Sequence, residues 1–258
     1  MKIVSWNVNS LRVRLPHVLD WLAANQPDML AIQEIKMVDD DFPVEAIRDA
    51  GYQVLVSGQK TYNGVCIISK LAGTDVHKDL PGLDDPQRRL LAATYGNVRL
   101  VNLYVPNGES LESEKYGYKL NWLSKLDSYL QQELKKHPRL VVVGDFNIAP
   151  DDRDVYDPVA WKDQVLCSAP ERQAFQSLLA HGLKDTFRLF EQPERIYSWW
   201  DYRAMAFRRN IGLRIDHILA STNMADVCRT SFVDKAPRNL ERPSDHAPVV
   251  AEFDIQNG

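Results

Sequence analysis

The sequence predicts an α/β fold in which mixed β-sheets carry helices on their outer faces. Two observations support this prediction: strand-like segments outnumber helical ones, and some neighbouring strands are separated by only a short turn. A short turn can join antiparallel strands, whereas parallel neighbours need a longer connection such as a helix, so both kinds of pairing are expected. The chain has no linker, low-complexity tract or fixed-period repeat, which predicts one domain over residues 1–258.

The predicted strands are short runs that are either continuously apolar or alternate between apolar and polar residues. In chain order they are KIVSWNV (2–8), MLAIQEI (29–35), YQVLVSG (52–58), GVCIISK (64–70), LAATYG (91–96), VRLVNLYV (98–105), LVVVGDF (140–146), YSWWDY (197–202), RIDHILAS (214–221) and PVVAEFDI (248–255).

Helical periodicity is clearest over residues 116–136. Leucines recur there at helical spacing and form one apolar stripe, with Lys and Gln over much of the remaining surface; they are Leu120, Leu123, Leu126, Leu130 and Leu134. Shorter helices are predicted over residues 16–26 and 171–182, the second ending at Gly182. We expect the leucine stripe to be core packing rather than a binding surface.

Composition and charge narrow the class of protein. Hydrophobic residues make up 45% of the chain and charged residues 26%, as in ordinary globular proteins. No apolar run approaches the about 20 residues of a membrane helix, and the N-terminus lacks a signal-peptide core, so we predict a cytoplasmic protein with no membrane partner. The net charge of −4 argues against a nucleic-acid partner, but carboxylates that line a metal site would themselves add negative charge.

The three cysteines, Cys66, Cys167 and Cys228, are odd in number and widely spaced. No CxxC pair is present, which favours reduced thiols over a disulfide framework or a zinc site. Cys66 lies in the apolar run GVCIIS, and we expect it in the core.

The stretch GDFNIAP (144–150) follows a strand that reads as buried on both faces. Asp145 and Asn147 are two residues apart, so an extended chain directs both side chains to the same side. A carboxylate and a carboxamide directed together from a buried strand are costly unless something binds them. Gly, Asp and Asn also form turns, and this stretch alone leaves the two interpretations open.

The same pattern recurs at other predicted strands. Polar or ionisable residues interrupt or end apolar runs at Asn7, Glu34, Asn102, Tyr104, Asp216, Asp245 and His246. Each has a structural explanation, such as a cap, a turn or a hydrogen-bonded core group. Together they are the side-chain types that hold a hard divalent cation and a phosphate.

Six motifs, in this order, resemble the exonuclease III group, the bacterial apurinic/apyrimidinic endonucleases and 3′-exonucleases of the endonuclease/exonuclease/phosphatase superfamily. They are WNVNSLR (6–12), QEIK (33–36), LYVPNG (103–108), GDFNIAP (144–150), LRIDHIL (213–219) and SDHAP (244–248). The resemblance implies a four-layer sandwich of two mixed sheets packed face to face with helices outside. It also implies a monomeric, Mg²⁺-dependent phosphodiester hydrolase, with Mn²⁺ as a substitute, acting on duplex DNA at abasic sites or 3′ ends.

The resemblance carries over to individual residues. It implies a metal site formed by Asn7, Glu34, Asp145, Asn147, Asp245 and His246, with Glu34 as the principal carboxylate. It implies that Asp145 activates the attacking water and that His246, held in its tautomer by Asp216, contacts the phosphate. Which of Asp145 and His246 is the base stays open. Tyr104 would assist the phosphate or the leaving oxygen, and Asn147 would bond a phosphate oxygen and steady Asp145.

Further residues are implied to contact DNA. Trp199, with Leu213 and Ile215 as apolar neighbours, would line a pocket for a flipped, baseless sugar, which fits because such a sugar leaves the base stack cheaply. Asn107 would support Tyr104, and Arg88 would contact the phosphate backbone. Arg88 is one of four weaker candidates for such contacts, together with Tyr62, Asn63 and Lys119. The irregular segment 148–170 is expected to be functional, and His217 receives no role.

Two other functions are considered. One is a phosphatase or phosphodiesterase of the same superfamily acting on lipids or small molecules, which YSWWDYR (197–203) together with SDHAP disfavours. The other is a non-catalytic nucleic-acid-binding relative, disfavoured because the predicted metal and catalytic residues are all present. The sequence does not determine the balance between abasic endonuclease and 3′-exonuclease activity.

Overall fold

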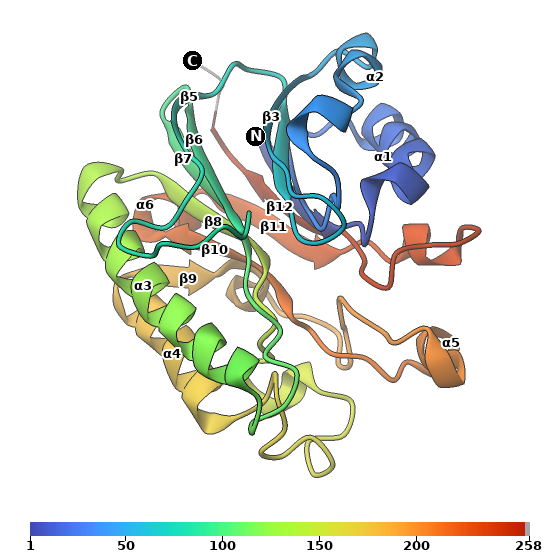
Figure 1. Ribbon diagram of the computed structural model, residues 1–258, viewed down its shortest axis with the longest axis vertical. Helices are drawn as coiled ribbons and strands as arrows, with labels where there is room; N and C mark the ends of the chain where they lie inside the picture. Colours follow the sequence, from blue (N-terminus) through green and yellow to red (C-terminus); the bar gives the residue numbers. More distant parts are fainter. Residues whose placement is uncertain (256–258) are drawn as a thin grey trace.

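Two six-stranded sheets pack face to face in the computed structural model, which describes residues 1–255 (Figure 1). The first sheet has the order β11-β12-β1-β2-β4-β3, with β1 (Lys2–Asn7), β2 (Met29–Gln33), β3 (Gln53–Ser57), β4 (Val65–Ser69), β11 (Cys228–Val233) and β12 (Val249–Phe253). The second has the order β5-β6-β7-β8-β10-β9, with β5 (Thr74–His77), β6 (Leu90–Tyr95), β7 (Val98–Tyr104), β8 (Leu140–Asp145), β9 (Leu183–Asp185) and β10 (Asp216–Ser221).

Both sheets are mixed, as predicted. β1 runs parallel to β2 and β7 runs parallel to β8, while the other neighbours are antiparallel. The longer helices lie on the outer faces, with α1 and α2 on the first sheet and α3 and α4 on the second (Figure 1). The helices are α1 (Leu11–Asn25), α2 (Val44–Asp49), α3 (Glu114–Lys136), α4 (Ala169–Ala180), α5 (Ala206–Arg209) and α6 (Thr222–Ala225). Short 3₁₀ turns occur at Asp39–Asp41, Asp152–Asp154, Thr186–Leu189, Arg203–Met205 and Ala236–Asn239.

The core has one layer between the sheets and one beneath each set of helices. In β8, Val141 and Val143 face the layer between the sheets, whereas Val142 faces α3 and α4. The predicted leucine stripe packs in the α3 layer: Leu123, Leu126 and Leu130 are buried, and Leu120 and Leu134 are partly buried. The stripe is therefore core packing, as predicted, and Cys66 is also buried.

A buried polar link joins the two sheets and accounts for Asn102. Its Nδ2 donates to the carbonyl oxygens of Ile32 (3.0 Å) and Cys66 (2.9 Å), both in the opposite sheet. Its Oδ1 accepts from Nε2 of Gln33 at 2.8 Å. Because buried polar groups stabilise a fold only when they are paired, these bonds favour one relative placement of the sheets.

The structure corrects three parts of the predicted element list. Residues 197–202 are not a strand, because their backbone bonds divide between two separate segments: Trp199 pairs with Leu213, and Trp200 N donates to Asp245 O. β5, β9 and β11 were missed, since they are short or lie at sheet edges and lack an apolar pattern. α1 begins five residues before the predicted start at Pro16, which lies inside the helix.

Within the described part of the chain, no helix has the length and apolar character needed to cross a membrane. The thiols of Cys66, Cys167 and Cys228 are free.

Candidate active site

Polar side chains from both sheets gather where the parallel strands end. Asn7 is the last residue of β1 and Glu34 follows β2, while Tyr104 and Asp145 end β7 and β8 in register with each other. Asp216 begins the antiparallel β10 directly opposite Asp145. Because the carboxyl ends of parallel strands share one edge, each sheet delivers its polar residues to the same end of the sandwich.

Gly144 shows why this strand end has the sequence Gly-Asp. Its φ is +151°, and a Cβ atom there would lie 2.0 Å from the carbonyl oxygen of Leu103 in the neighbouring strand. A side chain would collide with backbone, so only glycine permits this close approach of β8 to β7. The backbone is unusual again at Asn147 (φ +49°) and Glu34 (φ +56°). Left-handed non-glycine residues often cluster at functional sites.

Glu34, Asp145 and His246 form a group that could hold a metal ion. One ligand atom from each residue lies within 4.8 Å of the others. The amide of Asn7 holds the two carboxylates together, donating to Glu34 Oε1 at 2.8 Å and to Asp145 Oδ2 at 2.9 Å. The side-chain oxygen of Asn7, Oδ1, accepts from Asn9 N at 2.9 Å. Asn7, a predicted metal ligand, thus orients the two carboxylates of this group.

The electrostatics of this group suit a cation. Burial raises the pKa of Asp145 to about 7, against the attraction of His246, and Asp216 and Glu34 add repulsion. Glu34 is an ion-pair partner of Lys36, whose Nζ lies 2.8 Å from Oε2. Carboxylate oxygens are the ligands that Mg²⁺ prefers, and a divalent cation would relieve the repulsion between these groups.

His246 is held between two carboxylates. Its Nδ1 lies 2.9 and 3.1 Å from the two oxygens of Asp216, and its Nε2 lies 3.7 Å from Asp145 Oδ2. Burial favours the neutral ring, but the attraction of Asp216 and Asp145 outweighs it and raises the pKa of His246 to about 10. The two carboxylates thus favour the protonated ring, and Nδ1 faces Asp216.

Ser198 and Ser244 complete this arrangement and were not predicted. Ser198 Oγ donates to Asp216 Oδ2 at 2.6 Å. Ser244 Oγ donates to the carbonyl of Asn7 at 2.7 Å and accepts from His246 N at 3.2 Å. Each serine lies within two residues of a predicted site residue, and that proximity was the available sequence signal.

The two asparagines predicted near the phosphate lie side by side. Asn107 Nδ2 donates to Asn147 Oδ1 at 3.0 Å, so this oxygen already has a partner. Asn147 steadies Asp145 as predicted, but through its backbone: Asn147 N donates to Asp145 Oδ1 at 2.9 Å.

Tyr104 lies beside the carboxylate group. Burial, with repulsion from Glu34 and Asp145, raises the pKa of Tyr104 far above its ordinary value, so the phenol is a neutral donor. The Arg89 guanidinium lies 4.7 Å from the Tyr104 ring centroid and donates to the Tyr104 carbonyl at 3.2 Å. A cavity of about 740 Å³ adjoins them and is also lined by Asn107.

Asp245 stands apart from the metal-binding group. Its carboxylate accepts from Trp199 Nε1 at 3.0 Å and from Asn9 Nδ2 at 3.0 Å. These bonds fix Trp199 at the edge of an apolar cluster that contains Leu213 and Ile215, which are 1% and 2% exposed. The predicted sugar-pocket residues are therefore neighbours, with only Trp199 partly open to solvent.

The predicted phosphate-backbone residues have different surroundings. Tyr62 is 67% exposed, whereas Asn63 is buried and bonded to Gln59 and Gln87. Arg88 pairs with Asp79 at 2.5 Å. The expectation for Lys119 is wrong: its side chain is 0% exposed and cannot reach a DNA backbone.

His217 and Arg214 form hydrogen bonds that hold the irregular segment after Asn147 in place. His217 Nε2 lies 2.9 Å from the carbonyl of Ile148, and Arg214 donates to both oxygens of Asp154. Burial and the adjacent guanidinium of Arg214 lower the pKa of His217 to about 4, so this ring is neutral. His217 thus anchors the segment through a backbone carbonyl.

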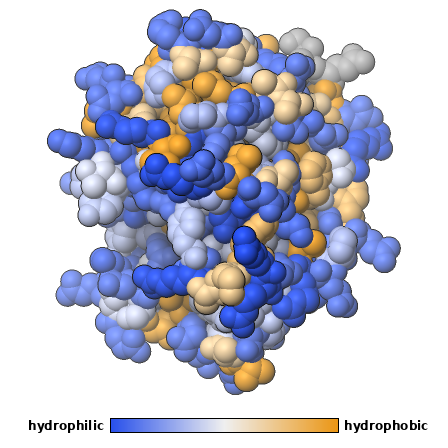
Figure 2. Space-filling model, turned by 90° about the vertical axis from the view of Figure 1, so that its right-hand side faces the viewer, coloured by the Kyte–Doolittle hydropathy of each residue, from blue (hydrophilic) through white to orange (hydrophobic). Residues whose placement is uncertain are grey.

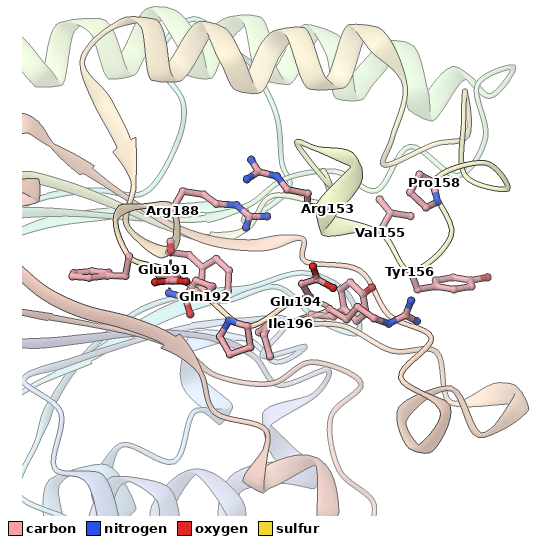
Figure 3. Close-up of a pocket in the computed structure, with 14 residues that line it drawn as sticks. Arg153, Val155, Tyr156, Pro158, Arg188, Glu191, Gln192, Glu194 and Ile196 are labelled. Atoms are coloured by element: carbon pink, nitrogen blue, oxygen red, sulfur yellow. Dashed lines mark hydrogen bonds between the residues drawn. The ribbon is translucent and has the colours of Figure 1, made fainter.

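A second cavity, of about 540 Å³, lies between this segment and residues 187–197 (Figure 3). Arg153 and Arg188 lie near each other in this view, and Val155 and Tyr156 line the cavity from the same irregular segment as Arg153 (Figure 3). None of the predicted site residues lines this cavity. Figure 2 shows the face on the α1 and α5 side, where hydrophilic residues predominate and hydrophobic residues are scattered.

Comparison with known proteins agrees with this geometry. The chain matches the endonuclease/exonuclease/phosphatase family over residues 4–246. Exodeoxyribonuclease III of Haemophilus influenzae is 38% identical, with 98% of this chain and 100% of that protein covered. DNA repair nuclease APEX1 of Danio rerio is 30% identical, with 96% and 81% covered.

Solved structures give the same result. The 3′ phosphatase NExo from Neisseria, bound to a product DNA hairpin, has a TM-score of 0.97 and 52% identity, with 99% of this chain and 100% of that chain covered. An AP endonuclease from Archaeoglobus fulgidus has a TM-score of 0.96 and 40% identity, with the same coverage. The predicted sandwich of two mixed sheets is confirmed, and the chain belongs to the endonuclease/exonuclease/phosphatase family.

Proposed function

We propose that this chain is a metal-dependent DNA-repair nuclease. It would hydrolyse phosphodiesters of duplex DNA 5′ to abasic sites and remove blocking groups or nucleotides from 3′ ends. The observation that carries the proposal is the convergence of Glu34, Asp145 and His246, with Asp216 behind the histidine. Relatives named exodeoxyribonuclease III, AP endonuclease and 3′ phosphatase support DNA as the substrate.

Glu34 and Asp145 would hold the metal ion together with substrate oxygens, and Asn7 would keep the two carboxylates in place; His246 could join them only as a neutral ring. We propose Mg²⁺, with Mn²⁺ as a substitute, because oxygen ligands dominate the group. When bound, the ion would polarise the phosphate and stabilise the charge that develops on it.

Asp145 is the proposed base and His246 the proposed phosphate contact. The two carboxylates beside the His246 ring raise its pKa, which favours the protonated ring as a donor to a phosphate oxygen over a role as the base. In the metal-free fold burial raises the pKa of Asp145 to about 7, and a carboxylate with a raised pKa is a better proton acceptor than a free one. Tyr104, as a neutral phenol, would donate to the phosphate or to the leaving oxygen.

We propose that the surface around Glu34, Asp145 and His246 recognises the damaged strand. Trp199 would meet a baseless sugar, with Leu213 and Ile215 behind it. Asn107 would bond the phosphate, and Arg88 would contact the backbone farther along the strand, after release from Asp79. We propose that one monomer, folded as a single domain, carries out the reaction.

Three matched duplexes test the function: one with an internal abasic site, one with a recessed 3′ hydroxyl end and one with a 3′ phosphate. Each is incubated with Mg²⁺ and, in parallel, with a chelator. We expect the protein to cleave the abasic and 3′-blocked duplexes in the presence of Mg²⁺. The chelator should abolish this cleavage. Binding of all three duplexes without Mg²⁺-dependent cleavage of any would contradict the proposal and favour a non-catalytic DNA-binding protein.

A further inference from the structure

Lys119 lies on the inner face of α3 with no exposed surface, close behind the proposed active site. Its Nζ donates to the carbonyl oxygen of Asn147 at 2.6 Å and to that of Asn107 at 3.1 Å. The third acceptor is the carboxylate of Glu171, an ion pair with no exposure on either side. An ammonium group has three donors, and each is used by a different segment of the chain.

The two carbonyl groups belong to the residues that adjoin the reacting centre. Asn107 and Asn147 lie just beyond β7 and β8, and their side chains bond to each other at 3.0 Å. Asn147 is in the left-handed region, and its N–H holds Oδ1 of Asp145 at 2.9 Å. The carbonyl that Lys119 bonds and the N–H that bonds Asp145 lie on either side of the Asn147 Cα, so a displacement of that carbonyl would turn the residue and move the Asp145 carboxylate with it.

Glu171 fixes the position of the ammonium from the other side. Its carboxylate accepts from Leu166 N at 3.0 Å and Ser168 N at 3.1 Å, and it forms the capping box of α4. Glu171 is thus held by the helix N-terminus and by the end of the irregular segment. The ion pair joins α3, α4 and both asparagine segments in one buried contact.

We propose that Lys119 is a positioning residue for the hydrolysis reaction. Its ammonium group fixes the two asparagine peptides and, through Asn147, the orientation of the Asp145 carboxylate. The inference rests on the proposed function, because it assigns water activation to Asp145. Lys119 is buried and cannot contact the substrate, so it would affect turnover only through the residues that it positions.

The test uses a double variant, Lys119→Met with Glu171→Gln. Methionine keeps the length of the side chain, and glutamine keeps one acceptor oxygen, for either Leu166 N or Ser168 N, so no buried charge is left unpaired. Some loss of melting temperature is expected, because one of these N–H groups and the two asparagine carbonyls lose their present partners, so cleavage is measured well below the melting transition. Single-turnover cleavage should fall by about 10- to 100-fold, the size expected when a catalytic group is displaced slightly. DNA affinity should change little.

A matched control is the buried pair Arg99–Glu133, at the opposite end of the same helix. Arg99 Nε lies 2.7 Å from Glu133 Oε2, with 0% and 1% side-chain exposure. The double variant Arg99→Met with Glu133→Gln removes the same type of ion pair at a distance from the active site. Its cleavage rate should equal that of the wild type.

The outcomes separate positioning from general stability. A wild-type rate in the Lys119 double variant, or equal losses in both double variants, would overturn the proposal. If the Lys119 double variant fails to fold, Lys119→Arg replaces it: this variant keeps the charge but places a larger group against the two carbonyls. Its rate should fall with unchanged DNA affinity, and an unchanged rate would overturn the proposal. Absence of cleavage by the wild type would instead contradict the proposed function.

Discussion

The two ends of the sandwich bury charge in different ways. At the active-site end, Asp145 and Asp216 share the single imidazole of His246, and all three side chains are at most 5% exposed. At the other end, the guanidinium of Arg99 is paired with Glu133, which also lies 3.5 Å from Lys136. The first group has an excess of negative charge, and the second has its charges matched.

This difference separates a reactive group from a structural one. Burying an ion is costly unless its charge is compensated, so an uncompensated cluster persists only because the surrounding fold holds it. The excess carboxylates leave room for a cation and a polarised water. The compensated pair offers nothing to a ligand and contributes only to the fold. Each prediction below changes one end and leaves the other intact.

The largest effect on turnover is expected from Asp145→Asn. Asparagine keeps the shape and can still accept from Asn147 N, but it cannot take a proton from water. Cleavage in a single turnover should fall by about 10²–10⁴-fold, the usual contribution of a general base. Binding should persist or tighten, because a negative charge that faces the phosphate is gone. A rate within a few-fold of wild type would return Asp145 to the role of a turn residue.

His246→Asn should have a smaller but still large effect. The variant removes the positive charge that Asp216 holds toward the phosphate, and loss of one such donor costs about 10²–10³-fold in turnover. DNA affinity, measured by titration beside the kinetics, should fall much less. If affinity falls as steeply as rate, His246 is a binding residue and the proposed mechanism is wrong.

The sequence predicted this active site better than it predicted the supports around it. Asp145 could be placed because the apolar run before it marks a buried strand that ends there, whereas Asn147 lies beyond β8 in the left-handed region, so strand alternation does not set its side-chain direction. Residues 197–202 could not be placed, because their pairing depends on partners at Leu213 and Asp245, far along the chain. A local pattern carries no information about such partners.

Lys119 was predicted to contact the DNA backbone but is buried, and its spacing along the helix could have indicated this burial. Lysine is usually exposed, which favoured a surface role. Yet Lys119 precedes Leu123 by four residues and Leu126 by seven, so helical spacing places it on the buried face of α3. The acceptors that make this burial tolerable come from segments on both sides of it in sequence, and a single sequence does not bring them together.

A third prediction concerns how the melting temperature depends on pH, with and without Mg²⁺. The pKa of Asp145 is raised from 3.8 to about 7 in the metal-free fold, so folding favours its neutral form. Its contribution to stability is complete at pH values below 3.8 and is lost as pH rises through about 7. Protons compete with the cation for the same oxygens, so the rise in melting temperature on adding Mg²⁺ should grow over this range.

Glu34→Ala is the matched variant for that experiment. It removes the other carboxylate of the group, so the Mg²⁺-dependent rise in melting temperature should largely disappear along with most cleavage. For the wild type, Mg²⁺ at 100 times its dissociation constant would stabilise the fold by about 2.7 kcal/mol. An undiminished Mg²⁺ response and near-normal cleavage in Glu34→Ala would show that the ion binds elsewhere.

The smallest effect on turnover is expected from Arg99→Met, which changes the compensated end. Removing one partner leaves Glu133 as a buried carboxylate whose remaining ion-pair contacts are to Lys136 Nζ and His137 Nε2, at 3.5 and 3.7 Å. Breaking such a pair costs about 3–5 kcal/mol of unfolding free energy, and the partly exposed Lys136 should keep the loss toward the lower bound.

Below the melting transition, the folded enzyme should cleave an abasic duplex at the wild-type rate, because Arg99 shares no contact with the carboxylate group. Chemical denaturation and single-turnover cleavage on one preparation measure both quantities. A large fall in rate with unchanged stability would mean that the two ends are coupled and that the compensated pair is not merely structural.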